Sequence, residues 1–453
     1  MPGVEYSMLD RINASGSMAM FSFDKSAALF EAARASIAGG VNSNVRYGES
    51  PPLFFVRGDG PRLHDVDGNV LIDYVLGNGP AILGHAAPAV IGPVAASLST
   101  GQSIAGQHRG EIDLAARLKR IVASAELVRF SVTGSEAVHA AIRLARGYTG
   151  RSRFVKFEGQ YHGWLDNVFI STRPGLNEAG PRESPAAVLM SRGQAERAKD
   201  EVIVLPWNDA AALARAFEVH GADIAAVLTE PVMCNCGVIP PRQGYLEAMR
   251  KMCSDAGAVL IFDEVITGFR VGLGGAQARF GVTPDLSVFA KAVANGFPLS
   301  VLAGKRAIME LIEPKGQVVH SGTYNGNITS VTAAVATLDA LAADPQAYAR
   351  MEARGTRLME GLRQCARRHG EDVLVQGFGS VFCTLFTDAK EVVDFRSATA
   401  ADAARMNAFA AALARNGVRT TPRGVWFLSM AHGEAEIDAT LAAADQAMAE
   451  LER

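Results

Sequence analysis

The sequence predicts an α/β protein built around a large, mainly parallel β-sheet, and two observations carry this prediction. Short apolar runs alternate with helix-length stretches from about residue 110 to about residue 330, as in parallel sheets whose strands are buried on both faces. The chain has 453 residues, 49% of them hydrophobic and 20% charged, which suffices for a large core and two or three domains. The predicted strands are Val128–Val132, Phe154–Phe157, Val202–Leu205, Ile224–Leu228, Ala258–Phe262 and Leu286–Ala290.

The segment before this sheet predicts one helix and a small β meander. Residues Asp24–Ile37 have a helical pattern. Between Pro51 and Tyr74, short apolar runs flank two glycine-containing turns, which is typical of a meander. This segment has little core of its own, so we expect residues 1–75 to pack beside another part of the chain.

The last third of the sequence predicts a separate α+β unit. We expect a small domain that combines residues 1–75 with residues 341–453, and a large domain of residues 76–340. The elements predicted in the last third are helices at Pro345–His369, Ala401–Asn416 and Glu434–Leu451, and strands at Gly379–Phe386 and Val425–Met430.

Composition narrows the possible partners. The formal net charge of −3 does not favour nucleic acid or an anionic membrane. The five cysteines are odd in number and lack a framework spacing, which favours reduced thiols over disulfides or a metal site. Residues 1–25 show no signal-peptide pattern, and no segment approaches the ~18 consecutive apolar residues of a membrane span. We therefore expect a soluble, cytoplasmic protein.

Ligands of open α/β sheets bind beyond the carboxyl ends of the strands, so the residues that follow each predicted strand are candidates for the site. After the first strand come Gly134 and Ser135, just before a helical pattern. Glycine allows close backbone approach, and a helix start offers free N–H groups, so this turn suits a phosphate. The same residues are equally compatible with Ser135 as an ordinary N-cap.

Two further strand ends carry candidate groups. Tyr161 and His162 stand between glycines after the second strand, an arrangement that suits a flat, stacked ring or, alternatively, a packed loop. Asp263 and Glu264 follow the fifth strand, where an acid is costly unless it is paired or functional. We expect Asp263 to be the buried working carboxylate, facing a cationic ring nitrogen, and Glu264 to be solvated or salt-bridged.

Lys291 directly continues the last apolar run. Desolvation at such a position lowers the pKa of the amine and prepares it for Schiff-base chemistry. The spacing from Asp263, 291 − 263 = 28 residues, fits one helix plus one strand, which places both groups at nearby strand ends. A lysine and a carboxylate so placed are what pyridoxal 5′-phosphate requires.

The segments Phe262–Arg270 and Ser321–Asn327, together with Lys291, resemble the class III aminotransferases of fold type I. The likeness runs from about Gly39 to about His432 and is greatest for the glutamate-1-semialdehyde aminomutase branch. It implies a seven-stranded, mainly parallel large domain, a small α+β domain formed by both termini, and a homodimer with shared active sites.

The resemblance also implies roles for individual residues. Lys291 matches the Schiff-base lysine that transfers the proton, and Asp263 matches the partner of the ring nitrogen. Thr323 matches a threonine that reaches the phosphate of the neighbouring subunit. The expected cofactor-binding residues are Gly134, Ser135, Tyr161, His162, Glu230, Asn235, Asp263, Val265, Lys291 and Thr323, and the expected substrate-binding residues are Ser43, Arg46 and Arg423.

The sequence departs from the aminomutase pattern in ways that bear on the reaction. Asn78 stands where a tryptophan is expected, and Arg423-Gly424 matches β-amino-acid and aromatic aminotransferases of the same branch. Two arginines, Arg46 and Arg423, supply anchors for two different carboxylates. We therefore expect a ping-pong aminotransferase acting on an amino acid and a keto acid, with Asn78, Met233 and Trp426 around the substrate side chain.

Three alternatives accompany this hypothesis. The first is glutamate-1-semialdehyde 2,1-aminomutase activity. The second is a ligand-sensing module without catalysis, against which stands the lack of a basic helix-turn-helix pattern before residue 110. The third is a dinucleotide loop at residues 272–275, which lacks the full glycine spacing and which we instead interpret as a flexible active-site loop.

Overall fold

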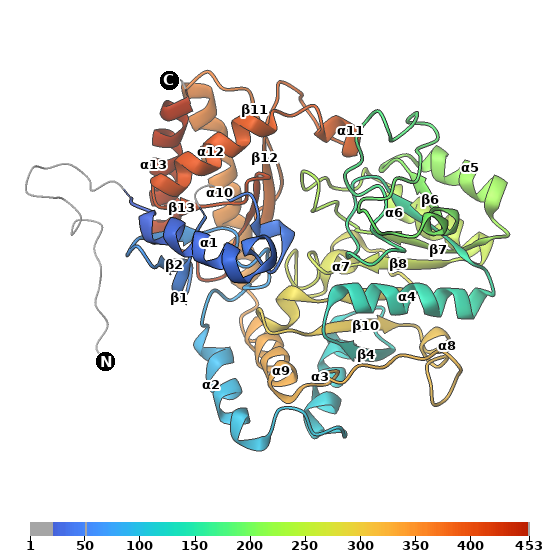
Figure 1. The fold of residues 1–453 in the computed structure, drawn as a ribbon. Helices are drawn as coiled ribbons and strands as arrows, with labels where there is room; N and C mark the ends of the chain where they lie inside the picture. Colours follow the sequence, from blue (N-terminus) through green and yellow to red (C-terminus); the bar gives the residue numbers. More distant parts are fainter. Residues whose placement is uncertain (1–20, 50–51, 452–453) are drawn as a thin grey trace, which may run out of the picture.

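The computed structural model describes residues 21–49 and 52–451 of the chain (Figure 1). Its central sheet has seven strands. Residues 1–20 and Pro51 of the predicted first segment lie outside the described residues. All six predicted strands are confirmed within one residue at each end. The sheet order is β4 (Leu127–Ser131), β10 (Ser300–Gly304), β9 (Leu286–Phe289), β8 (Val259–Asp263), β7 (Ile224–Thr229), β5 (Arg153–Phe157) and β6 (Val202–Leu205).

Strand β10 was not predicted. It pairs antiparallel with both β4 and β9, whereas the other neighbouring strands pair parallel. An antiparallel neighbour needs no helical crossover, so β10 follows β9 after only a short connection. The alternation of apolar runs with helix-length stretches therefore gave no signal for it.

Both faces of the central sheet are covered by helices, as the continuous apolar strands predicted. In β7, Ala226 and Leu228 belong to the core beneath α4 (Gly134–Thr149), whereas Val227 belongs to the opposite core. That second core includes side chains from α5 (Ala210–His220) and α6 (Tyr245–Ala256). The sheet is thus held rigid between two apolar layers.

Two smaller sheets lie apart from the central sheet. The N-terminal strands join the C-terminal part through a parallel pairing of β3 with β13, and Figure 1 shows β1 and β2 on the same side of the molecule as α10, α12 and α13. One sheet has the order β1 (Phe55–Asp59), β2 (Arg62–Asp65), β3 (Val70–Asp73) and β13 (Val418–Arg419). The other has the order β11 (Val373–Phe378), β12 (Val381–Phe386) and β14 (Val425–Phe427).

The predicted terminal helices are confirmed, with ends that differ by at most two residues. They are α1 (Asp24–Ser36), α10 (Ala347–Arg368), α12 (Ala403–Arg415) and α13 (Glu434–Leu451). The other helices are α2 (Pro88–Ser97), α3 (Arg109–Ile121), α7 (Gly275–Phe280), α8 (Arg306–Met309), α9 (Ile328–Ala343) and α11 (Phe395–Ala398). Short 3-10 helices are η2 (Ala38–Gly40), η3 (Asn44–Arg46), η4 (Leu98–Thr100), η5 (Glu196–Glu201) and η6 (Lys291–Ala294).

The domain boundaries near residues 75 and 340 remain proposals. Residue 340 lies inside α9, which packs against α2 and α3. We propose that the second boundary falls at the end of α9, so that the helix stays whole. Within the described residues, no helix has both the length and the apolar character needed to cross a membrane.

Candidate active site

A pocket of about 660 Å³, partly open to solvent, lies at the carboxyl ends of the central strands. Ligand sites of open α/β sheets are expected at this edge. Its lining includes every predicted cofactor residue except Thr323. The lining residues are Gly134, Ser135, Val138, Tyr161, His162, Gly163, Glu230, Val232, Asn235, Asp263, Val265, Ile266, Thr267, Ala290 and Lys291.

Lys291 begins η6 immediately after β9 and Ala290. Its φ of +50° lies in the left-handed region, which costs a non-glycine residue about 1–2 kcal/mol and is found mainly at functional sites. Burial lowers the pKa of its amine to about 8, against the opposing charges of Asp263 and Glu230. About a tenth of the amine is therefore neutral and nucleophilic at pH 7, far more than for an ordinary lysine.

Asp263 is held by two hydrogen bonds at the end of β8. Its Oδ1 accepts from the backbone N–H of Val265 at 3.1 Å, and its Oδ2 lies 2.8 Å from Nδ1 of His162. Burial lowers the pKa of His162, so the imidazole is neutral at neutral pH and its Nδ1–H donates to the carboxylate. This pairing orients Asp263, and no spacing in the sequence indicated it.

Glu230 ties two loops of the pocket together. Its Oε1 accepts from the N–H of Tyr161 at 2.9 Å, and its Oε2 accepts from the N–H groups of Cys234 at 2.9 Å and Asn235 at 3.4 Å. Burial raises the pKa of Glu230 to about 7, and the nearby charge of Asp263 adds to this effect. Glu230 therefore acts mainly as a scaffold for the residues that line the pocket.

The first turn of α4 keeps N–H groups available for an anion. Thr133, not Ser135, is the N-cap: it forms a capping box with Glu136. The N–H groups of Gly134 and Ser135 have no acceptor among the described residues, and both residues line the pocket. A side chain at Gly163 would come within 2.5 Å of the Ser135 hydroxyl, so glycine keeps this turn open. The arrangement fits a phosphate group.

The prediction that Glu264 is solvated or salt-bridged is wrong. It is fully buried, and its carboxylate accepts hydrogen bonds from Thr267 at 3.0 Å and from the N–H groups of Ala276 at 2.5 Å and Gln277 at 3.1 Å. The carboxylate thus supplies acceptors for N–H groups in the first turn of α7, which have no partner within the helix. The glycine segment 272–275 accordingly leads into a helix that Glu264 binds, and it does not line the pocket.

Lys156 is a fully buried lysine that sequence reasoning missed, because it lies within an apolar run. Its Nζ donates to the carbonyl oxygens of Phe157 at 3.4 Å, of Gln160 at 3.3 Å, and of Ile170. Burial lowers its pKa to about 7, against the charges of Glu230 and Glu158. Lys156 thus organises the backbone just before Tyr161.

Two arginines without an acidic partner lie near the pocket, although neither is among the residues that line it. Arg423 is half-buried and makes no ion pair or side-chain hydrogen bond with the described residues, yet its charge acts on Lys291 and Tyr161. Burial, together with the charge of Arg173, lowers its pKa to about 10. Arg173, which sequence reasoning missed, donates to the carbonyl oxygen of Asn235 at 3.2 Å and has no ion pair within the described part of the chain.

Several predicted residues, Arg423 among them, are not part of the pocket lining. Ser43 and Arg46 lie at η3, and Thr323 lies in an exposed turn. The prediction that Met233 and Trp426 line a substrate pocket is wrong. Both side chains are fully buried in apolar cores, and the indole N–H of Trp426 donates to Thr384 at 2.7 Å.

Comparisons with known proteins agree with this geometry. The family model "Aminotransferase class-III" matches residues 43–441. The chain is 41% identical over 436 residues to a glutamate-1-semialdehyde 2,1-aminomutase of Thermomicrobium roseum, covering 95% of this chain and 99% of the relative.

Solved structures share the fold. An omega-transaminase from Sphaerobacter thermophilus superposes with a TM-score of 0.90 at 33% identity, covering 94% of this chain and 98% of that one. A beta-phenylalanine aminotransferase from Variovorax paradoxus gives a TM-score of 0.82 at 28% identity, covering 93% of each chain. The predicted fold type I architecture is therefore confirmed, and the chain belongs to the class III aminotransferase family.

Proposed function

We propose that this chain is a pyridoxal 5′-phosphate-dependent aminotransferase that moves an amino group between an amino acid and a keto acid. The observation that carries the proposal is the placement of Lys291 and Asp263 in one pocket, with the unpaired Arg423 close enough for its charge to act on Lys291. A desolvated amine, a buried carboxylate and a free guanidinium are the groups that this reaction requires.

The lining residues fit the proposed cofactor. The free N–H groups of Gly134 and Ser135 would hold its phosphate, and Asp263 would face its ring nitrogen. Tyr161 and Val265 would cover the two faces of the ring. When bound, pyridoxal phosphate supplies an electron sink for the carbon that carries the amine.

Lys291 is the proposed proton carrier. Its Nζ would remove the proton from the amine-bearing carbon of the substrate and deliver it to the cofactor carbon that takes up the amino group. Because burial lowers the pKa of this amine to about 8, Lys291 is poised close to neutral pH, where general acid–base transfer typically contributes ~10²–10⁴-fold. Asp263, held by His162, keeps the ring nitrogen protonated.

Arg423 is the proposed anchor for the substrate carboxylate. A planar guanidinium binds a carboxylate through two parallel hydrogen bonds, and Arg423 has no competing acidic partner in the described residues. Arg46 and Ser43 are proposed to serve a second carboxylate. The resemblance to a beta-phenylalanine aminotransferase supports a β-amino or aromatic amino acid as donor.

Glutamate-1-semialdehyde 2,1-aminomutase activity is the second candidate. It is favoured by relatives of that name, including one of Pelotomaculum thermopropionicum that is 42% identical over 431 residues and covers 94% of this chain and 97% of the relative. The unpaired Arg423 favours the aminotransferase, because an internal amino transfer needs no separate acceptor carboxylate.

A half-reaction distinguishes the two candidates. Enzyme loaded with pyridoxamine phosphate is mixed with 2-oxoglutarate or pyruvate, and we expect an amino acid to form while the visible absorption of the cofactor returns. No turnover of either keto acid, together with conversion of glutamate-1-semialdehyde to 5-aminolevulinate, would contradict the aminotransferase.

A cytoplasmic homodimer is also proposed. His108 lies 2.8 Å from the carbonyl oxygen of Gly326, which joins the segment 98–112 to the turn that carries Thr323. Four large apolar side chains on these two segments are more than half exposed, as expected of a subunit interface. They are Leu98, Ile104, Ile112 and Tyr324. Sedimentation of the purified chain is expected to give the mass of two copies.

A further inference from the structure

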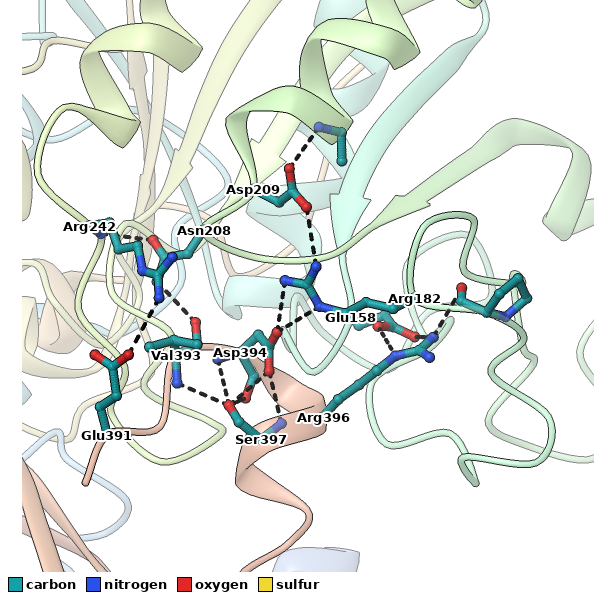
Figure 2. Close-up of polar contacts among 12 residues, drawn as sticks. Glu158, Arg182, Asn208, Asp209, Arg242, Glu391, Val393, Asp394, Arg396 and Ser397 are labelled. Carbon is teal, nitrogen blue, oxygen red and sulfur yellow. Dashed lines mark hydrogen bonds and ion pairs between the residues drawn. The ribbon is translucent and has the colours of Figure 1, made fainter. Parts of the chain in front are cut away.

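A strap from the C-terminal part of the chain, residues 391–397, is bound to the loops that follow the strands of the central sheet (Figure 2). The side-chain amide of Asn208 donates to the carbonyl oxygen of Val393 at 3.0 Å, and Arg242 lies 3.5 Å from Glu391. Asp394 caps the short helix α11 and accepts from Arg182 at 3.1 Å. The strap thus joins two parts of the molecule beside the pocket.

The most buried contact of the strap is the ion pair between Arg396 and Glu158. Nε and Nη2 of Arg396 donate to the two carboxylate oxygens of Glu158 at 3.0 and 2.9 Å, and Nη1 donates to the carbonyl oxygen of Gly180 at 2.9 Å. The Glu158 side chain is only 2% exposed. A carboxylate buried this deeply depends on its partner for compensation.

Glu158 starts the segment that carries Tyr161 and His162 into the pocket. A Cβ on the next residue, Gly159, would come within 2.8 Å of Cβ of Phe395, so α11 packs directly on this backbone. The N–H of Gly159 donates to the carbonyl oxygen of Ser171 at 3.0 Å. A shift of Glu158 would therefore be passed within three residues to Tyr161.

We propose that Arg396 is a positioning residue that acts through Glu158 to place Tyr161 and His162 around the cofactor. It does not line the pocket itself. The inference rests on the proposed cofactor site but not on the choice between aminotransferase and aminomutase. Without Arg396, the Glu158 carboxylate would turn toward water or toward Lys156, and both movements displace the aromatic segment.

The test compares Arg396→Met with Arg182→Met. The second variant is the control, because it removes another ion pair of the strap but leaves the pair between Arg396 and Glu158 intact. Apoenzyme is titrated with pyridoxal phosphate while visible absorption and circular dichroism are recorded. For Arg396→Met we expect a dissociation constant at least about tenfold higher and a weaker visible dichroism band, because both depend on contacts with the ring. Arg396→Lys should recover part of both signals.

Arg182→Met is expected to stay within about twofold of the parent, since its ion pairs are partly exposed. Equal cofactor affinity and dichroism in the Arg396→Met and Arg182→Met proteins would overturn the proposal. If Arg396→Met does not fold, the isosteric variant Glu158→Gln replaces it. A lower affinity for pyridoxal phosphate and a weaker visible dichroism band would support the proposal, whereas parental values of both would overturn it. If the parent protein binds the cofactor but does not transfer an amino group, the proposed function is contradicted and the proposed role of Arg396 is not.

Discussion

The two ends of the pocket differ in how their charged groups are compensated. At the cofactor end, Asp263 is bound by His162 and Val265, and Glu230 is bound by three backbone N–H groups. At the proposed substrate end, Arg423 and Arg173 lie outside the pocket lining and have no acidic partner among the described residues. The charged groups at the cofactor end are therefore compensated within the fold, whereas the half-buried Arg423 lacks such a partner and would gain one from a bound anion.

The largest expected effect is that of Lys291→Ala. Removal of the amine takes away the proposed proton carrier, and we expect kcat to fall by roughly 10³-fold, within the range for general acid–base transfer. Single-turnover kinetics measures the loss, and added methylamine should restore part of the rate. A variant with parental kcat would show that Lys291 carries no proton.

Asp263→Asn tests the cofactor end of the pocket. The amide keeps the shape of the side chain but not its charge, so the ring nitrogen loses its anionic partner and kcat is expected to fall about 100-fold. The KM for amino acids should change little, because Asp263 does not bind the substrate. A rise in KM with unchanged kcat would place Asp263 at the substrate end instead.

Arg423→Ala tests the proposed substrate end. We expect KM for carboxylate substrates to rise about 10–100-fold, since a hydrogen bond to a charged group contributes roughly 1.5–3 kcal/mol, with little change in kcat. Amines that lack a carboxylate serve as the control, because their KM should be unaffected. An equal rise for both kinds of substrate would mean that the mutation disturbs the pocket as a whole.

Cofactor capture by the apoenzyme should depend on pH. Only neutral Lys291 attacks an aldehyde, and burial lowers its pKa to about 8. The rate of pyridoxal phosphate binding should therefore rise with pH, by roughly tenfold from pH 7 to pH 9, and then level off. Stopped-flow absorbance measures this rate, and a steady rise up to about pH 10 would show an amine with its ordinary pKa.

Arg173→Ala is expected to have the smallest effect. Arg173 is exposed, so the loss of its charge should raise KM for a dicarboxylic keto acid by about threefold and leave that for pyruvate unchanged. Arg192→Ala, which removes another exposed arginine that does not line the pocket, is the matched control. The same KM change in both variants would indicate a general effect of net charge.

The sequence predicted the groups at strand ends well, because a parallel sheet brings its carboxyl ends to one edge. Lys291 and Asp263 each follow a continuous apolar run, so burial and position could be inferred together. Strand β10 escaped the same reasoning because an antiparallel neighbour needs no intervening helix.

Contacts between distant segments could not be inferred in this way. The bond between His162 and Asp263 and the ion pair between Arg396 and Glu158 join residues from separate strands or domains, and neither leaves a periodic signal. Trp426 was misplaced because a strand residue three positions after Arg423 can point either toward the pocket or into the core. Its indole N–H finds a buried acceptor, Thr384, which permits complete burial.

The position of β4 has a consequence for how the protein is made. Among the described strands its only neighbour in the central sheet is β10, and Ser131 pairs with Ser300. Contacts between residues so far apart in sequence form slowly, because a long loop must close first. The turn at Gly134 and Ser135 directly follows β4, so we expect it to reach its place in the sheet only after β10 has been synthesised. Each newly synthesised chain is therefore expected to complete the turn proposed to bind phosphate late, after most of the sheet has been translated.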